Sequence, residues 1–341
     1  MAGECLGRTK ELEQCFVADL GNATHPAVFL TPTGEPFVQL WQLYPALEPL
    51  TTVFEKTFNP LFSVHFATRN VWLALAICAA YCVLIEVGKA CMAKRKPMEL
   101  KTVLMLWNTL LAVFSIVGMA KTLPHLVHNV FNHGLEFSLC APAETSYGCG
   151  ATGLWTALFI FSKVPELGDT LFLVLRKRPV SFLHWYHHVS VLLYAWWSYA
   201  TRSSAGLWFI AFNFTAHAVM YSYYALAAMG FRNEAFALSV TVLQITQMIV
   251  GVAICTAVPI FAAGGSSCSM TTGAYAGGIV MYGSYLYLFL MFAIARYCRG
   301  PRPSKVADKS DGEAPAELPN KDAARTQDGQ LRQRKTAGKR D

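Results

Sequence analysis

Residues 70–96 of the chain read NVWLALAICAAYCVLIEVGKACMAKRK. The part from 70 to 91 is apolar, and Lys94, Arg95 and Lys96 follow it. A helix of about 20 apolar residues spans a bilayer about 30 Å thick. A membrane strand would be shorter and would alternate in polarity. The stretch therefore predicts a membrane-spanning helix that ends on a basic side.

Six further segments repeat this pattern. We expect spans near 70–91, 102–121, 152–175, 182–200, 206–228, 235–259 and 274–297. Charged residues make up 14% of the 341 residues, whereas soluble domains carry roughly 25%. The predicted fold is an all-α polytopic membrane bundle of seven transmembrane helices. The net charge of +7 is explained by helix-end clusters and the tail, so no nucleic-acid partner is expected.

The basic clusters predict an orientation. They follow the first, third, fifth and seventh segments, at 94–96, 176–178, 232 and 296–305. The intervening connections, 122–150, 201–205 and 260–273, contain Arg202 as their only Lys or Arg. By the positive-inside rule the odd-numbered segments end in the cytosol, so the N-terminus is lumenal and the C-terminus cytosolic.

Three regions follow from this topology. Residues 1–69 are expected to be a lumenal segment on the membrane surface, 70–299 the catalytic membrane domain, and 300–341 a disordered cytosolic tail. Asn22 begins a glycosylation sequon on the lumenal side. Oxidation is permitted there, and a disulfide is expected within one set of lumenal cysteines, whose pairing the sequence leaves open: Cys140, Cys149 and Cys268.

Ionisable side chains inside a membrane are costly and are candidates for function. His184, His187 and His188 have the spacing i, i+3, i+4, which places three imidazoles on one helical face. A single histidine in a membrane helix is often only a satisfied hydrogen-bonding group, but three histidines on one face at the mouth of a bundle favour a functional role. Segment 206–228 adds a polar stripe that contains Asn213 and His217.

Segment 152–175 carries Lys163, Glu166 and Asp169, with Thr170 beside them, on roughly one helical face. These groups can pair as a structural ion cluster, or a carboxylate can orient a nearby imidazole. Both interpretations stay open. Further polar candidates complete stripes on the two following segments: Tyr221, Tyr223 and Tyr224, and then Thr241, Gln244 and Gln247.

Two enzyme chemistries suit a histidine-rich membrane interior. A di-iron desaturase or hydroxylase needs about eight histidines, whereas four of the nine here lie on the membrane segments. Alternatively, a neutral imidazole attacks a thioester and holds the acyl group, without a metal or cofactor. A non-enzymatic seven-helix receptor or transporter is a third hypothesis, although no internal repeat is evident.

Four ordered motifs resemble the fatty acid elongase family, the membrane condensing enzymes of very-long-chain fatty acid synthesis. The first two are KVPELGDT (163–170) and HWYHH (184–188). The others are NFTAHAVMYSYY (213–224) and TVLQITQ (241–247). The amino-acid sequence of the histidine box most resembles that of elongases of saturated and monounsaturated chains.

The resemblance implies condensation of a fatty acyl-CoA with malonyl-CoA to a 3-oxoacyl-CoA two carbons longer. It assigns the acyl group to His187, assistance to His217 and thioester contact to His184, with His188 and Asp169 orienting the imidazoles. Asn213 is a further candidate catalytic residue. The candidate substrate-binding residues are Lys163, Glu166, Arg176, Arg178, Tyr221, Tyr223, Thr241 and Gln244. No metal or cofactor is expected.

The resemblance also implies residence in the endoplasmic reticulum membrane. Expected partners are acyl-CoA and malonyl-CoA as substrates, membrane lipids, the reductases and dehydratase of the elongation cycle, and a second copy of the chain. The acyl chain is expected in a tunnel that runs toward the lumenal end of the bundle.

Overall fold

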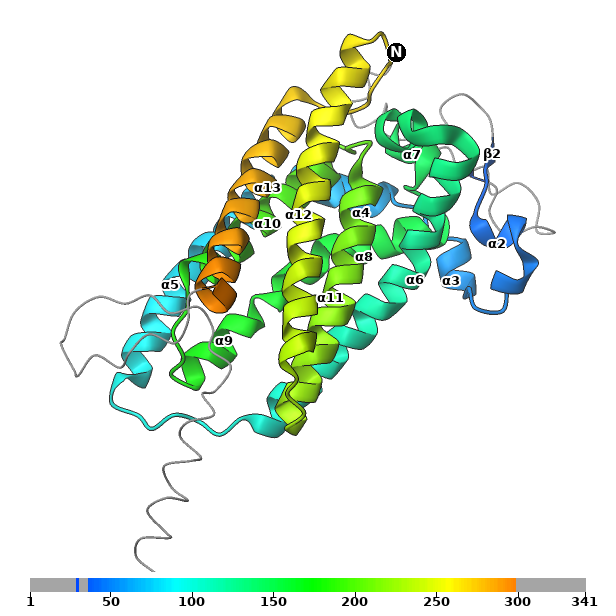
Figure 1. Cartoon of the computed structure of the whole chain (residues 1–341). Helices are drawn as coiled ribbons and strands as arrows, with labels where there is room; N and C mark the ends of the chain where they lie inside the picture. Colours follow the sequence, from blue (N-terminus) through cyan, green and yellow to red (C-terminus); the bar gives the residue numbers. More distant parts are fainter. Residues whose placement is uncertain (1–28, 31–35, 299–341) are drawn as a thin grey trace, which may run out of the picture.

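The structure, a computed structural model, describes residues 29–30 and 36–298 (Figure 1). The two short strands β1 (Phe29–Leu30) and β2 (Pro36–Phe37) pair antiparallel. All other regular structure in this part is helical, which confirms the all-α prediction. In chain order the helices are α2 (Leu40–Leu43), η2 (Pro45–Leu47), α3 (Val53–Lys56), α4 (Leu61–Arg69), α5 (Val71–Ala93), α6 (Lys101–Cys140), α7 (Ala143–Ser146), α8 (Gly150–Glu166), α9 (Gly168–Leu175), α10 (Phe182–Ala200), α11 (Gly206–Met229), α12 (Glu234–Ala263), α13 (Thr272–Ala293) and the π-helical turn η3 (Ile294–Cys298).

Four helices of the described part are long and apolar enough to cross a membrane: α5, α6, α12 and α13 together with η3. Between 22% and 33% of the residues in their apolar stretches are buried inside the protein. Most of these side chains therefore face outward, as in a protein that is solvated by lipid. Several apolar helices of this kind are typical of a multi-pass membrane protein.

Local sequence signals explain several helix ends. The side chain of Ser181 caps α10 by accepting a hydrogen bond from the backbone N–H of His184 (3.2 Å). Helix α11 ends at Gly230, whose φ of 110° is accessible to glycine at little cost. The side chain of Asn233 then caps α12. The helical stretches expected at 182–200 and 206–228 agree with α10 and α11 within one residue.

The expected single helix over 152–175 is wrong, because the structure divides it into α8 and α9. Pro165 lies in the last turn of α8 and has no N–H to donate to the helix. Helix α9 starts again at Gly168, where a Cβ atom would lie 3.1 Å from the Trp107 ring. The first motif therefore crosses a helix break.

The connection expected from residue 122 onward is also different, because α6 continues to Cys140 with a kink at Gly134 (φ 87°). Hydropathy falls after Lys121, but the polar side chains of Thr122, His125 and Asn129 are buried. His125 Nε2 and Asn129 Nδ2 lie 2.7 and 2.9 Å from the carbonyl oxygen of Ser146. These buried contacts favour a helix where composition alone indicated a loop.

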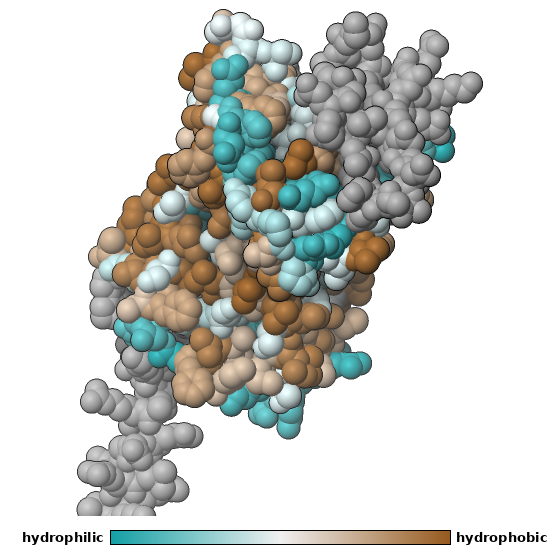
Figure 2. All heavy atoms as spheres, turned by 90° about the vertical axis from the view of Figure 1, so that its right-hand side faces the viewer, coloured by the Kyte–Doolittle hydropathy of each residue, from teal (hydrophilic) through white to brown (hydrophobic). Residues whose placement is uncertain are grey.

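Two ends of the bundle can be distinguished in Figure 1. At the lower end, α5, α9 and α11 finish beside the basic clusters of the sequence, and we call this the basic end. The α12–α13 connection lies at the opposite, distal end. Between them α11 packs most extensively on α6, and α10 lies against α5, α8 and α13. Figure 2 shows apolar side chains over much of one face between these ends.

A disulfide joins Cys140, at the end of α6, to Cys268 in the α12–α13 connection. Cys149 is buried and free. The expected disulfide is thereby present, and its pairing is resolved. The adjacent backbone is also tied, since Ser269 N donates to Cys140 O (2.9 Å). Asn22 and the tail from 300 onward lie outside the described residues.

Candidate active site

The histidine box begins α10 at its basic end. The rings of His184 and His188 lie 4.4 Å apart between centroids, and those of His187 and His188 lie 5.5 Å apart. His188 is buried, whereas His184 and His187 keep partial exposure. The three predicted imidazoles therefore form one cluster, and two of them remain accessible to a ligand.

His184 is oriented by a chain of hydroxyl groups. Thr170 Oγ1, in the first turn of α9, lies 2.8 Å from His184 Nε2, and Tyr81 OH of α5 lies 2.7 Å from Thr170 Oγ1. A fixed hydrogen bond at one ring nitrogen selects the tautomer of an imidazole. The helix break before α9 turns Thr170 toward the box.

The last turn of α8 supplies a buried ion pair. Lys163 Nζ contacts the two carboxylate oxygens of Glu166 at 2.8 and 3.0 Å, and it donates to Asn213 Oδ1 at 3.3 Å. His217 Nδ1 lies 3.9 Å from the other side of the same carboxylate. This pair fixes α8 to α11 beside His217. Lys163 is 2% exposed, so it does not lie at an entrance where CoA phosphates would be met.

Asp169 is held by two donors that do not belong to the histidine box. Trp107 Nε1 donates to Oδ1 (2.6 Å), and Tyr221 OH donates to Oδ2 (2.8 Å). The Tyr221 ring in turn lies edge-on to His217, 5.3 Å between centroids. The expected role of Asp169 in orienting the imidazoles is therefore indirect in this geometry, through Tyr221 and His217.

His187 is fixed from a helix that the sequence reasoning did not use. The Tyr285 ring of α13 packs 5.1 Å from the His187 ring, and its hydroxyl donates to the His187 carbonyl (3.1 Å). Ser190 Oγ lies 2.7 Å from the same hydroxyl. Tyr285 is 1% exposed.

The remaining predicted contacts lie nearer the basic end. Arg176 is partly exposed and Arg178 is exposed after α9. Thr241 Oγ1 lies 3.3 Å from Tyr297 OH, and Gln244 Nε2 lies 3.2 Å from the sulfur of Met220. Tyr223 packs on Phe236 at 5.0 Å between centroids. The contacts of Thr241, Gln244 and Tyr223 are thus with residues outside the histidine box.

Sequence reasoning missed Trp107, Tyr81, Tyr285 and Ser190. Each lies in an apolar segment where an aromatic or small hydroxyl side chain is ordinary. No spacing within one helix marks them, because each acts on a partner in another helix or another turn. Among the described residues, no three His, Cys, Asp or Glu side chains are grouped so that they could hold a metal ion.

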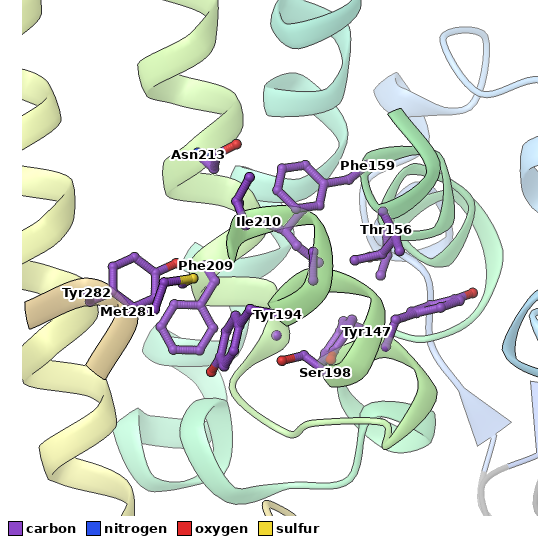
Figure 3. A pocket seen from close by; sticks show the side chains of 15 residues that line it. Tyr147, Thr156, Phe159, Tyr194, Ser198, Phe209, Ile210, Asn213, Met281 and Tyr282 are labelled. Carbon is purple, nitrogen blue, oxygen red and sulfur yellow. The ribbon is translucent and has the colours of Figure 1, made fainter. Parts of the chain in front are cut away.

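A narrow cavity of about 50 Å³ lies between α8, α10, α11 and α13, on the distal side of the histidine cluster; Figure 3 shows the side chains that line it. It reaches Val191, one turn after His187, and Asn213, one turn before His217. Aromatic side chains line much of it: Phe159, Tyr194, Tyr199, Phe209 and Tyr282. Tyr147 lies at the distal end, and its hydroxyl donates to the carbonyl of Ser203.

A family model described as "ELO: GNS1/SUR4 family" matches residues 66–305, which include the whole of this site. The chain belongs to this family. It is 45% identical over 249 residues to very long chain fatty acid elongase 6 of Drosophila melanogaster, covering 72% of this chain and 78% of that protein. It is 44% identical over 199 residues to the human protein of the same name, covering 58% and 74%.

A third relative, putative fatty acid elongase 3 of Caenorhabditis elegans, is 38% identical over 270 residues, with coverage of 78% and 83%. The protein is a fatty acid elongase, as the four motifs indicated. The match begins at residue 66, so β2, α2, α3 and the start of α4 precede the family domain.

Proposed function

We propose that this elongase condenses a fatty acyl-CoA with malonyl-CoA through an acyl group carried on His187. The observation that supports this is the position of the cavity. It begins one helical turn from His187 on α10 and one turn from His217 on α11. An apolar cavity beside two imidazoles suits an acyl chain whose thioester carbon lies at the histidines.

In the first half-reaction a neutral ring nitrogen of His187 attacks the thioester carbon, the carbon–sulfur bond breaks, and CoA leaves as a thiolate that takes up a proton. The partial exposure of His187 permits the approach, and Tyr285 holds its ring and backbone. His184, held by Thr170, lies beside the thioester.

In the second half-reaction malonyl-CoA loses CO₂, and the resulting enolate attacks the acyl carbon and expels the imidazole. The product is a 3-oxoacyl-CoA two carbons longer. His217 is proposed to stabilise the enolate, because it lies one turn from the same cavity as His187 does and is backed by Glu166 and Tyr221. Asn213, fixed by Lys163, lies where the acyl carbonyl would enter the cavity.

The substrates enter, in this proposal, from the basic end. The exposed Arg178 and partly exposed Arg176 suit CoA phosphates, which guanidinium groups bind with two hydrogen bonds. Tyr223, Thr241 and Gln244 are proposed to contact the CoA arm or the product. The acyl chain, proposed to be saturated or monounsaturated, would run from the histidines along this cavity toward Tyr147, and the acyl tunnel itself stays a prediction.

For the topology we propose seven crossings, with α8 and α9 together, α10 and α11 joining the four apolar helices. The basic end then faces the cytosol and the distal end the lumen of the endoplasmic reticulum. Residues 70–299 form the catalytic domain in this proposal. Association with the reductases and dehydratase of the elongation cycle, and with a second copy of the chain, stays a prediction.

The test is intact-protein mass spectrometry after incubation with acyl-CoA in the absence of malonyl-CoA. We expect a covalent acyl adduct that malonyl-CoA discharges as 3-oxoacyl-CoA. His187→Ala should abolish the adduct at an unchanged melting temperature, whereas His128→Ala, on the exposed side of α6, should retain it. An adduct that persists in His187→Ala would refute the acyl-imidazole.

A further inference from the structure

In the segment that precedes the family domain, charged side chains are buried and apolar side chains are exposed. Glu55 and Lys56 of α3 are 6% and 9% exposed, whereas the neighbouring Leu50, Val53 and Phe54 are 68%, 73% and 68% exposed. In a water-soluble domain charged side chains are almost never the buried ones unless they are paired. We call Leu50, Val53 and Phe54 the apolar patch.

The two buried charges are paired on the inner side of the segment. The Glu55 carboxylate lies 3.0 Å from Lys121 Nζ of α6 and accepts a hydrogen bond from Trp155 Nε1 of α8 (2.8 Å). Lys56 Nζ reaches Glu48 at 3.2 Å and lies over the Trp41 ring at 4.7 Å. These contacts hold α3 against the bundle and leave the apolar patch directed outward.

Lys121 also fixes the depth of the patch, because its Nζ donates to the carbonyl of Leu50 (2.6 Å). Lys121 lies 20 residues beyond Lys101, the first residue of α6, which is about 30 Å along a helix. That length matches the hydrocarbon thickness of a bilayer. The patch therefore lies near the far boundary of the hydrocarbon layer that α6 crosses.

The patch also continues an outward-facing apolar surface. Val113 and Ile116 of α6, one to two turns before Lys121, are 55% and 45% exposed. Helix α6 is one of the candidate spans, so these side chains face lipid. In Figure 1, α3 lies beside α6 and below the distal tip of the bundle, at the level of the helices. Figure 2 views the protein from this side.

We propose that the apolar patch of Leu50, Val53 and Phe54 inserts among the lipid acyl chains of the leaflet at the distal end. The chain ahead of the family domain is then a second membrane-contacting element, anchored to α6 and α8 by Glu55. It enters the leaflet without crossing it, and the buried Glu55–Lys121 pair keeps these two charges out of the hydrocarbon. Neither the lipid contact nor its test depends on the proposed acyl transfer.

The test uses the full-length protein in liposomes and the variant Phe54→Trp. Wild type has 8 tryptophans, so its fluorescence is subtracted to give the emission of the added tryptophan. Quenching of this added emission is measured with lipids brominated on the acyl chains and, separately, with aqueous iodide. Leu110→Trp, on the exposed face of α6, is the lipid control. Ser267→Trp, exposed in the α12–α13 connection at the same end, is the water control.

We expect brominated lipid to remove most of the added emission of Phe54→Trp, as it does for Leu110→Trp, and iodide to remove little. Quenching by iodide to the extent seen for Ser267→Trp would overturn the proposal. Quenching by neither reagent would also overturn it, because residues 1–28 or a second copy of the chain would then cover the patch. If Phe54→Trp does not elute as folded protein, Val53→Trp repeats the measurement.

Discussion

Removing one partner of the buried Lys163–Glu166 pair gives the sharpest test of how the site is held together. Both side chains are almost fully buried, at 2% and 5% exposure. Lys163→Met leaves the Glu166 carboxylate in the interior without its cation. Breaking a buried pair in this way costs about 3–5 kcal/mol. At about 2–4 °C per kcal/mol for a domain of this size, the melting temperature should fall by about 10 °C.

The chain offers a matched control for this variant. Lys89 and Glu86 of α5 have the same separation in sequence and the same 2.8 Å contact, but their side chains are 48% and 73% exposed. Lys89→Met should cost no more than about 1 kcal/mol, because the protein does not enclose this exposed pair, so the remaining charge is not left in the interior. The two pairs thus differ mainly in burial, and the comparison isolates the cost of an unpaired interior charge.

The assay is thermal unfolding of purified protein in detergent, followed by gel filtration and by intrinsic fluorescence. The double variant Lys163→Met, Glu166→Gln should recover most of the lost stability, because no buried charge is left unpaired. It should not recover turnover, since Asn213 loses its bond to Lys163 and His217 its neighbouring carboxylate. If Lys163→Met melts within about 3 °C of Lys89→Met, a difference of about 1 kcal/mol, the reasoning is refuted.

Four further outcomes are expected. Tyr285→Phe should lower kcat with little change in KM or melting temperature, because the hydroxyl positions His187 without binding substrate. Tyr287→Phe, on the outer face of α13, should leave kcat unchanged. An equal loss of kcat in both variants contradicts this. Cys140→Ser should lower the free energy of unfolding by about 2–5 kcal/mol, and reducing agent should destabilise the wild type but not the variant. Burial raises the pKa of Glu55. Hydrogen bonds from Trp155, Thr52 and Lys121 together lower the pKa by more than burial raises it, so it lies below the ordinary 4.5. Glu55 therefore stabilises the fold above pH 4.5 and loses this effect as the pH falls through the lowered pKa, so the gap in melting temperature between wild type and Glu55→Gln should close in acid; a gap that stays constant opposes it. Ser198→Leu, which adds bulk to the cavity lining, should shorten the longest product at normal turnover of short substrates, as read by chromatography of the products.

Much of this protein could be predicted from its sequence, because helices and spans depend on local patterns. A run of about 20 apolar residues is recognisable without tertiary information. Helical spacing alone placed His184, His187 and His188 on one face. The four motifs were sufficient to indicate the family, which the match over residues 66–305 shows.

Contacts between helices were beyond this reasoning, because they depend on how each helix is rotated against its neighbours. Thus Tyr81, Trp107 and Tyr285 look like ordinary apolar-segment aromatics until the bundle sets them on Thr170, Asp169 and His187. The choice of Cys140 over Cys149 as the partner of Cys268 has the same origin.

The helix break before α9 shows where local and tertiary information meet. Pro165 and Gly168 were visible in the sequence, but the apolar run across them predicted one continuous helix. Only packing against Trp107 makes the break useful, since it directs Lys163 and Glu166 to α11 and Thr170 to the histidine box. The sequence by itself determined which residues share a helix and which family they mark. The tertiary structure decided which of them meet, because burial and helix orientation are properties of the whole bundle.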